Sequence, residues 1–356
     1  MAVLNFFDTY ILMAIMEEVV PNTFFFRDRY FPTGEEDVFA ADKVLTEYRR
    51  GDRKMAAFVS ERIGDIPMGR IGYEIHELQP AYVGVSRLLT VDELKKRGFG
   101  EALYANSTPA QRAARLQRDD MRDMDLRIRR REEWMAVNTM LENACFIQEY
   151  VDAQTKGKAL NVKFYEGSSD HLYTPAKPWE TFMEMRADVI AMCRMLSYRG
   201  LPVSDLLLGT QTADAILQFD DLQRLLDKNS GIAVGAISEQ LSAYTGVVLL
   251  GTLNFGGFRL NLISVDESYM DDNDQTKPYF PVDAAMVTAP NCGHIMYGQI
   301  TQIDFGSTEY TSHPGIRVPK FSLDQDNDTR KLRLASRPLA APRNYCPYIL
   351  AKKVVG

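Results

Sequence analysis

The segment from Thr108 to Gly157 reads TPAQRAARLQRDDMRDMDLRIRRREEWMAVNTMLENACFIQEYVDAQTKG. It opens with an N-cap threonine, a proline at the first helical position and a glutamine at the third, a combination that predicts the start of a helix. No glycine or proline follows between Pro109 and Gly157. The segment therefore predicts one helix of about 40 residues, about 60 Å long at 1.5 Å per residue.

The two halves of this predicted helix differ in character. Residues 112–133 are mostly arginine, aspartate and glutamate, whereas Trp134, Val137, Leu141 and Ala144 lie on one apolar face. The charged half lacks the heptads of a coiled coil. We therefore expect the helix to lie across a surface, with its charged half held by ion pairs within the helix and to neighbouring copies of the chain.

The N-terminal segment is apolar and aromatic. Residues 4–18 carry apolar side chains at intervals of three or four, the spacing of a short helical arm that needs a partner surface. The stretch from Phe24 to Phe31 then reads FFFRDRYF. Burial stabilises by roughly 2 kcal/mol per ring, so these phenylalanines predict a buried cluster.

Strand patterns occupy much of the remaining chain. Residues 38–90 predict a long β-hairpin with strands at 44–48, 55–59 and 70–77, followed by a helix that opens at Thr90. Further on, an α/β pattern predicts strands at 159–165, 206–208, 246–254 and 258–265, with helices after Pro178 and from 212 to 227. Strands return at 284–287 and between 331 and 355.

The composition is that of a globular protein. The chain has 356 residues, of which 46% are hydrophobic and 25% charged, so it predicts about two domains rather than a disordered chain. A net charge of -7 argues against a dedicated duplex-DNA binder. The sequence contains neither a run of 18 apolar residues nor a basic leader. We therefore expect no membrane span and no export, which favours the cytosol.

The chemical motifs are weak. Cys292-Gly293-His294 is the one Cys/His pairing and lacks further ligands, so a structural role is favoured. The acidic residues 324–328 imitate a calcium loop, but Thr329 and Ala335 replace its glycine and glutamate. Phosphate-binding, dinucleotide-binding and nucleophile-elbow motifs are absent from the sequence. We predict no catalytic, cofactor-binding or metal-binding residues.

Two other classes of function stay open on the residues alone. One is a cytosolic α/β enzyme with its site within residues 160–305. The other is a nucleic-acid-binding protein that uses the arginine-rich helix, which Asp119, Asp120, Asp123 and Asp125 make less favourable because they interrupt its basic run.

Several stretches resemble one known family. They are Phe24–Phe31 followed by Asp37-Val38-Phe39, Met121-Arg122-Asp123 leading into Glu133-Trp134-Met135-Ala136-Val137, Lys277-Pro278-Tyr279-Phe280-Pro281, and the strands of residues 338–354. In order and spacing they resemble the major capsid protein E family of tailed phages, typified by phage lambda.

The resemblance implies the Hong Kong bacteriophage-type major capsid protein fold, of class α+β. Its expected parts are an N-terminal arm (1–36), an extended β-hairpin loop with flanking strands (37–92), a peripheral domain with a spine helix (93–165), an axial domain (166–305) and the C-terminal strands of the peripheral domain (306–356). The arm is expected to pack on a neighbouring subunit.

The resemblance also implies a function that is structural rather than enzymatic. The chain is expected to assemble with itself, as hexamers and pentamers, into an icosahedral head shell around packaged double-stranded DNA. A decoration protein, a scaffold and a portal are further expected partners, and a membrane is not. An acidic subunit suits weak, non-specific contact with DNA that must slide during packaging. Assembly is expected in the bacterial cytoplasm, and the product is the virion capsid.

One branch of this fold joins a lysine of the hairpin loop covalently to an asparagine of a neighbour. Residues 55–94 contain no lysine, while Lys54 is expected at the hairpin's base and Lys95 lies beyond it. Arginine keeps its proton and cannot act as that nucleophile. We therefore expect this cross-link to be absent.

Overall fold

The computed structural model describes most of the chain outside the arm and the hairpin tip. The described residues are 23–41, 44–48, 74–89, 109–150, 156–165, 169–222, 224, 244–271, 274–324 and 329–355. The expected arm, the strand at 55–59 and the helix after Thr90 lie outside these residues. In the described part of the chain, no helix is long and apolar enough to cross a membrane.

The long helix, α4, spans Pro109–Glu142, or 34 residues. It is shorter than the sequence predicted, because Asn143 adopts a left-handed φ of 52° and its buried side chain accepts a hydrogen bond from Tyr348 Oη at 2.9 Å. The chain then turns into β4 (Ala144–Tyr150), which pairs with β5 (Lys156–Lys163). Ala144 therefore belongs to a strand and not to the apolar face of the helix.

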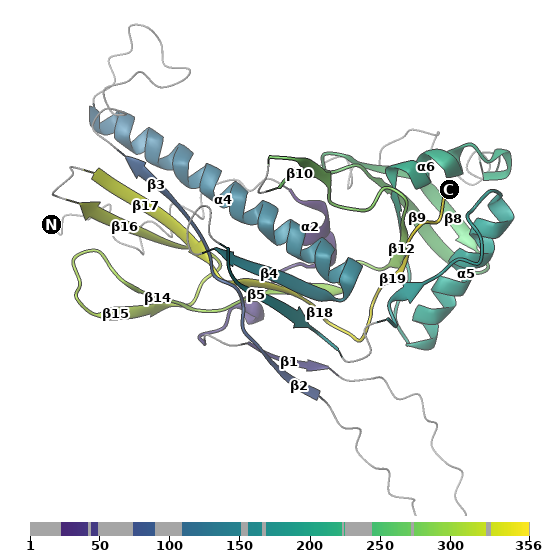
Figure 1. The fold of residues 1–356 in the computed structure, drawn as a ribbon, viewed down its shortest axis with the longest axis horizontal. Coiled ribbons are helices and arrows are strands. Elements are labelled where there is room, and N and C mark those ends of the chain that lie inside the picture. Colours follow the sequence, from purple (N-terminus) through teal and green to yellow (C-terminus); the bar gives the residue numbers. More distant parts are fainter. Residues whose placement is uncertain are drawn as a thin grey trace, which may run out of the picture.

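Helix α4 crosses one face of a three-stranded antiparallel sheet (Figure 1). The strands are β16 (Val318–Asp324), β17 (Thr329–Ser336) and β3 (Val83–Leu89), in that order. Between helix and sheet lie the buried side chains of Met121, Met124, Ile128, Phe321, Leu332 and Leu334. The expectation that the helix lies across a surface is confirmed.

A six-stranded mixed sheet forms the other end of the molecule (Figure 1). Its order is β6 (Leu172–Tyr173), β19 (Ile349–Ala351), β12 (Ala285–Thr288), β7 (Asp205–Gly209), β9 (Phe258–Val265) and β8 (Val247–Phe255). Strands β8 and β9 match their predicted positions. Because β19 lies in this sheet, the C-terminal segment contributes strands to both sheets.

The two faces of this sheet bury different cores. Leu206 and Leu208 of β7 face α5 (Phe182–Tyr198) and α6 (Thr210–Leu217), whereas Leu207 between them packs in the main core. Strand residues alternate between faces, which explains this division. Helix α5 begins at a Thr181–Glu184 capping box that the prediction overlooked, and α6 ends at Leu217, well before the predicted residue 227.

Four short antiparallel pairings complete the fold. They join β1 (Val44–Tyr48) to β2 (Glu74–Leu78), β10 (Ser268–Met270) to β11 (Thr276–Pro278), β13 (Gly293–Tyr297) to β18 (Pro338–Pro342), and β14 (Ile300–Ile303) to β15 (Tyr310–His313). A short 3-10 helix, η1, spans Glu35–Asp37.

The first of these pairings is the base of the predicted long hairpin. Tyr48 lies opposite Glu74, so residues 49–73 connect the two strands. Lys54 belongs to this connection and lies outside the described residues, so its expected place at the hairpin's base stays a prediction.

The aromatic segment is buried, as predicted. Helix α2 (Phe25–Tyr30) and the adjoining Phe31 lie in the main core with α4 and β13. Gly293 of β13 makes this packing possible, because a Cβ at that position would lie 2.2 Å from Phe31 Cε1 and 2.8 Å from the backbone oxygen of Ala341.

We predict that Gly293→Ala lowers the free energy of unfolding by about 1–3 kcal/mol, since the new methyl group overpacks the Phe31 site. Urea denaturation measures the change. The control is Gly34→Ala, where the nearest side-chain atom would lie 3.4 Å from the new Cβ and φ is -99°. That variant is expected to stay within about 1 kcal/mol of the parent chain. Equal losses in both variants would contradict the steric explanation.

Candidate functional site

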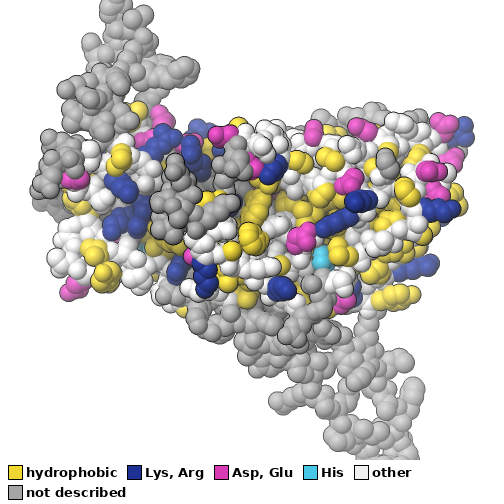
Figure 2. Space-filling model, viewed as in Figure 1, with side chains coloured by type: hydrophobic (Ala, Val, Ile, Leu, Met, Phe, Trp, Pro, Cys, Tyr) yellow, Lys and Arg dark blue, Asp and Glu magenta, His cyan; other side chains and the backbone are white. Residues whose placement is uncertain are grey.

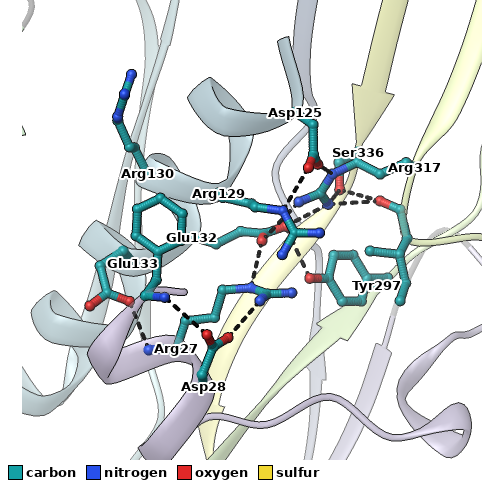
Figure 3. A network of polar contacts seen from close by, with 12 residues as sticks. Arg27, Asp28, Asp125, Arg129, Arg130, Glu132, Glu133, Tyr297, Arg317 and Ser336 are labelled. Carbon is teal, nitrogen blue, oxygen red and sulfur yellow. Dashed lines mark hydrogen bonds and ion pairs between the residues drawn. The ribbon is translucent and has the colours of Figure 1, made fainter. Parts of the chain in front are cut away.

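A buried polar network joins α2, α4, β13, β17 and the loop before β16 (Figure 3). We call it the polar centre and define it by Arg27, Asp28, Asp125, Arg129, Glu132, Glu133, Tyr297, Arg317 and Ser336. Segments that are far apart in the sequence meet here, so their side chains fix how the elements are placed.

Arg317 is the cation at the middle of this network. Its Nη1 and Nη2 donate to the two carboxylate oxygens of Glu132 at 2.7 and 3.0 Å, and its Nε donates to Asp125 Oδ1 at 2.7 Å. All three residues are buried. Burial alone would raise the pKa of Glu132, but Arg317 lowers it below its usual range. The pair is therefore ionised.

Glu132 has further partners on two other elements. Its Oε2 accepts a hydrogen bond from Arg27 Nε at 3.0 Å, and its Oε1 accepts one from Tyr297 Oη at 3.0 Å. One carboxylate thus connects α4 to α2, to β13 and to the loop that carries Arg317.

The neighbouring Glu133 caps helix α2 from outside. Phe24, at the N-cap position, has no side chain able to accept a hydrogen bond. Glu133 accepts instead from the backbone N–H groups of Phe26 and Arg27, both at 2.7 Å. Burial and the nearby Glu267 raise the pKa of Glu133 to about 8, and the two backbone hydrogen bonds only partly oppose that shift.

A second anchor ties α2 to the six-stranded sheet. Asp205, at the start of β7, accepts from Arg29 Nε at 2.8 Å and Nη2 at 3.0 Å, and from Tyr30 Oη at 2.9 Å. Asn261 of β9 donates to the same carboxylate at 2.9 Å. Helix α2 therefore connects the long helix to the sheet, through Glu132 and Glu133 on one side and Asp205 on the other.

The charged half of α4 also forms ion pairs within the helix and with a neighbouring strand. Arg127 pairs with Asp123 at 3.3 Å, and Arg129 with Asp125 at 2.6 Å, both across one helical turn. Arg87 of β3 pairs with Asp120 and Asp123. The expected pairs within the helix are confirmed, and a sheet strand of the same chain adds to them.

The Cys/His pairing lies in a structural setting. Cys292 is buried, and His294 Nδ1 lies 2.7 Å from Asp37 Oδ1. Burial lowers the pKa of His294 more than Asp37 raises it. Among the described residues, no group of three or more potential ligands could hold a metal ion. The favoured structural role of this pairing is consistent with both findings.

The cysteines are poorly placed for nucleophilic chemistry. All four are free and buried, and burial raises the pKa of Cys145, Cys193 and Cys292 to about 12. A thiol is reactive as its thiolate, so these side chains stay inert at neutral pH.

The acidic residues 324–328 lie partly in the described chain. Asp324 lies opposite Thr329 at the end of the β16–β17 hairpin, which fits an acidic turn. Residues 325–328 lie outside the described part.

The polar centre was not predicted from the sequence. The charged half of the helix was expected to form ion pairs within the helix and to neighbouring copies, not with distant segments of the same chain. The available signal was spacing, because Asp125 and Glu132 fall at intervals of three or four from Met121, Ile128 and Met135. An acid on an apolar stripe requires a buried cation, yet the sequence does not say that Arg317, 185 residues from Glu132, supplies it.

Two solved structures with a similar architecture come from phage or prophage capsids. A prophage capsid protein of E. coli CFT073 is 17% identical, with a TM-score of 0.65 and coverage of 97% of this chain and 98% of that one. The capsid of Ralstonia phage GP4 is 12% identical, with a TM-score of 0.50 and coverage of 95% and 93%. The fold is therefore the Hong Kong bacteriophage-type capsid fold.

The family follows from the sequence comparison. The model of the family described as phage major capsid protein E matches residues 8–352. The chain belongs to this family and forms capsid shells, as the resemblance implied. No curated protein is similar enough to add to this assignment. The comparisons give no support to the alternative of an α/β enzyme.

We predict that Arg317→Met lowers the free energy of unfolding by about 3–5 kcal/mol, because Glu132 and Asp125 lose the buried cation that they share and keep only Arg27 and Arg129. Urea denaturation of the unassembled protein measures this loss. Arg127→Met is the control, since the Arg127 side chain is 59% exposed and its pair contributes less than about 1 kcal/mol. A loss below about 1 kcal/mol in Arg317→Met would show that the polar centre does not hold the fold together.

We predict that Glu133 makes the fold less stable as the pH rises. Its pKa is about 8 in the folded chain and 4.5 for an ordinary glutamate, so between these values the folded state retains a proton that the unfolded state has released. Its contribution is full below about pH 4.5 and is lost as the pH rises through about 8. Denaturation at several pH values measures the slope.

Glu133→Gln, which cannot titrate, should flatten that slope. Glu267→Gln should reduce it, because the variant removes a nearby charge that raises the pKa of Glu133. A slope that is the same in the parent chain and in Glu133→Gln would contradict this assignment.

Proposed function

We propose that the chain assembles from hexamers and pentamers into the icosahedral head shell of a tailed phage and encloses its double-stranded DNA. The observation that carries this proposal is the family match over residues 8–352. The net charge of -7 supports weak, non-specific contact with DNA, which must move during packaging. Assembly in the bacterial cytoplasm, with a scaffold, a portal and a decoration protein as partners, is part of the same proposal.

Exposed apolar side chains support extensive contact between copies. The most exposed are Tyr310 at 78%, Tyr198 at 74%, Met270 at 67% and Met183 at 63%. They lie on three elements: Tyr310 on β15, Met270 on β10, and Met183 and Tyr198 at opposite ends of α5. Apolar groups placed around a subunit suit a protein with neighbours on several sides. Figure 2 shows other hydrophobic side chains at the surface of one face.

The proposed subdivision follows the expected boundaries. The peripheral domain comprises residues 93–165 and 306–356 and carries α4, while the axial domain comprises residues 166–305. The arm comprises residues 1–36, of which residues 1–20 pack on a neighbouring subunit, while α2 lies in the core of its own chain. The extended hairpin loop with its flanking strands comprises residues 37–92.

Electron microscopy of the purified protein tests the proposal. Negative-stain images and size-exclusion chromatography should show shells, hexamers and pentamers. A compact species of about 40–160 kDa at every concentration would favour the enzyme alternative.

We predict that deletion of residues 1–20 leaves a folded but assembly-defective protein. The apolar face of the arm is separated from the first strand by Pro21 and Pro32, so it is expected to pack on a neighbour and not on its own core. Circular dichroism monitors folding and negative-stain imaging monitors assembly. Normal shells from the truncated chain would contradict this role.

We predict that mature particles boiled in detergent and reductant run as a single band near 40 kDa, because residues 55–94 contain no lysine. Lys54 lies in the connection between β1 and β2, so Lys54→Arg is the matched control. A ladder of multimers in the parent chain would show that this prediction is wrong. Loss of that ladder in Lys54→Arg would then identify Lys54 as the nucleophile.

A further inference from the structure

The three-stranded sheet has a second face, opposite to α4, on which cations gather. Strand pairing places Ser86, Arg333 and Lys320 in one row across β3, β17 and β16, and Leu88, Lys331 and Ser322 in the next row. Residues paired in this way point to the same side of a sheet. The helix-facing side holds the alternate residues, such as Leu332 and Leu334. We call the two rows the outer sheet face.

Two cations on this face lie directly opposite each other. Lys320 of β16 is the register partner of Arg333 of β17. Lys331 lies two residues before Arg333 in β17. Like charges in such a pair destabilise a sheet. Partial burial lowers the pKa of Lys320, and Arg333 lowers it further. The isolated chain therefore carries an electrostatic cost at this position.

Asp304, whose charge acts on Lys320, already has other partners. Asp304 Oδ2 lies 2.8 Å from His313 Nε2, and Asp304 Oδ1 accepts from Gln302 Nε2 at 3.0 Å. Gln302 Oε1 in turn accepts from Arg333 Nη2 at 3.0 Å. The Nε of Arg333 is buried and has no hydrogen-bond partner in the structure. The outer sheet face thus holds the N–H donor of Arg333. It also holds cations whose charge is offset only in part by acids of the same chain.

We propose that the outer sheet face binds carboxylate side chains of a second copy of this chain, which pair with Lys320, Lys331 and Arg333. The inference rests on the proposed shell assembly and goes beyond it by naming a surface and its chemistry.

The composition of the face favours a protein partner over DNA. Leu88, in the same row as Lys331, is 57% exposed. An apolar side chain beside cations is typical of a protein interface, whereas a surface for the phosphate backbone is dominated by cationic and polar groups. The chain itself has a net charge of -7, so a second copy offers acidic groups at the high local concentration of a shell.

Zero-length cross-linking tests the contact directly. Shells are assembled from equal amounts of ¹⁵N-labelled and unlabelled protein and treated with a carbodiimide, which joins an amine to a carboxylate in contact. Mass spectrometry is expected to find mixed-isotope peptides at Lys320 or Lys331. Links within single copies alone, such as Lys320 to Asp304, would overturn the proposal.

Charge reversal separates assembly from folding. Lys320→Glu replaces a like-charge pair by an opposite-charge pair, so the melting temperature of the unassembled chain should rise by on the order of 1 °C. The assembled fraction should nevertheless fall roughly tenfold or more, because a neighbour's carboxylate would meet a like charge. Lys331→Glu should also impair assembly. The control, Lys177→Glu, changes an exposed lysine of another region and should assemble normally.

Each of the remaining outcomes would contradict the proposal. Normal assembly of both Lys320→Glu and Lys331→Glu would refute the proposal. Normal shells with weaker binding of a 20-bp duplex would identify the face as a phosphate surface and also refute it. A parent chain that forms no assemblies would overturn the proposed function as well, whereas shells without mixed-isotope links would overturn this inference alone.

Discussion

The ion pair between Glu132 and Arg317 is the interaction on which the other elements depend. Both side chains are buried, so each would be very costly in this position without the other. Replacing such a pair by apolar residues is often neutral or stabilising, whereas removing one partner leaves a buried charge and is strongly destabilising. Its geometry admits one placement of the long helix against the loop before β16, and Arg27 and Tyr297 extend that constraint to α2 and β13.

Helix α2 transmits this constraint to the rest of the molecule. It has only six residues, too few to be stable alone, and Glu133 of α4 caps its N-terminus. Arg29 and Tyr30 then reach Asp205 of the six-stranded sheet. The long helix and the sheet are therefore joined through one short, buried segment, as well as through the main core that they share. A movement between them would have to break charge-assisted hydrogen bonds away from water, which favours a single rigid body in the described part.

Local patterns predicted individual elements well, and long-range pairing was the part that they could not supply. The proline and glutamine after Thr108 marked the start of α4, and strand patterns in the sequence located β8 and β9. The end of α4 was missed because it depends on Asn143, whose left-handed conformation is held by Tyr348 from the far end of the chain. The polar centre was missed for the same reason. The likeness to a family supplied the overall arrangement, since order and spacing along the whole chain carry more information than any short motif.

Charges in the polar centre are paired within one chain, whereas the charge of the cations on the outer sheet face is offset only in part. This difference implies that folding comes before assembly. In the polar centre, Glu132 and Arg317 are paired within one chain, so their desolvation is offset as soon as that chain folds. On the outer sheet face, Lys320 opposes Arg333, and that cost persists until an anionic group arrives. A subunit built in this way folds without help and keeps part of its electrostatic stabilisation for contact with a neighbour. The free energy gained from one such contact is small, but a shell repeats the contact at every equivalent interface. Weak pairs therefore suffice for a stable assembly, and its subunits can still correct their positions as the shell forms.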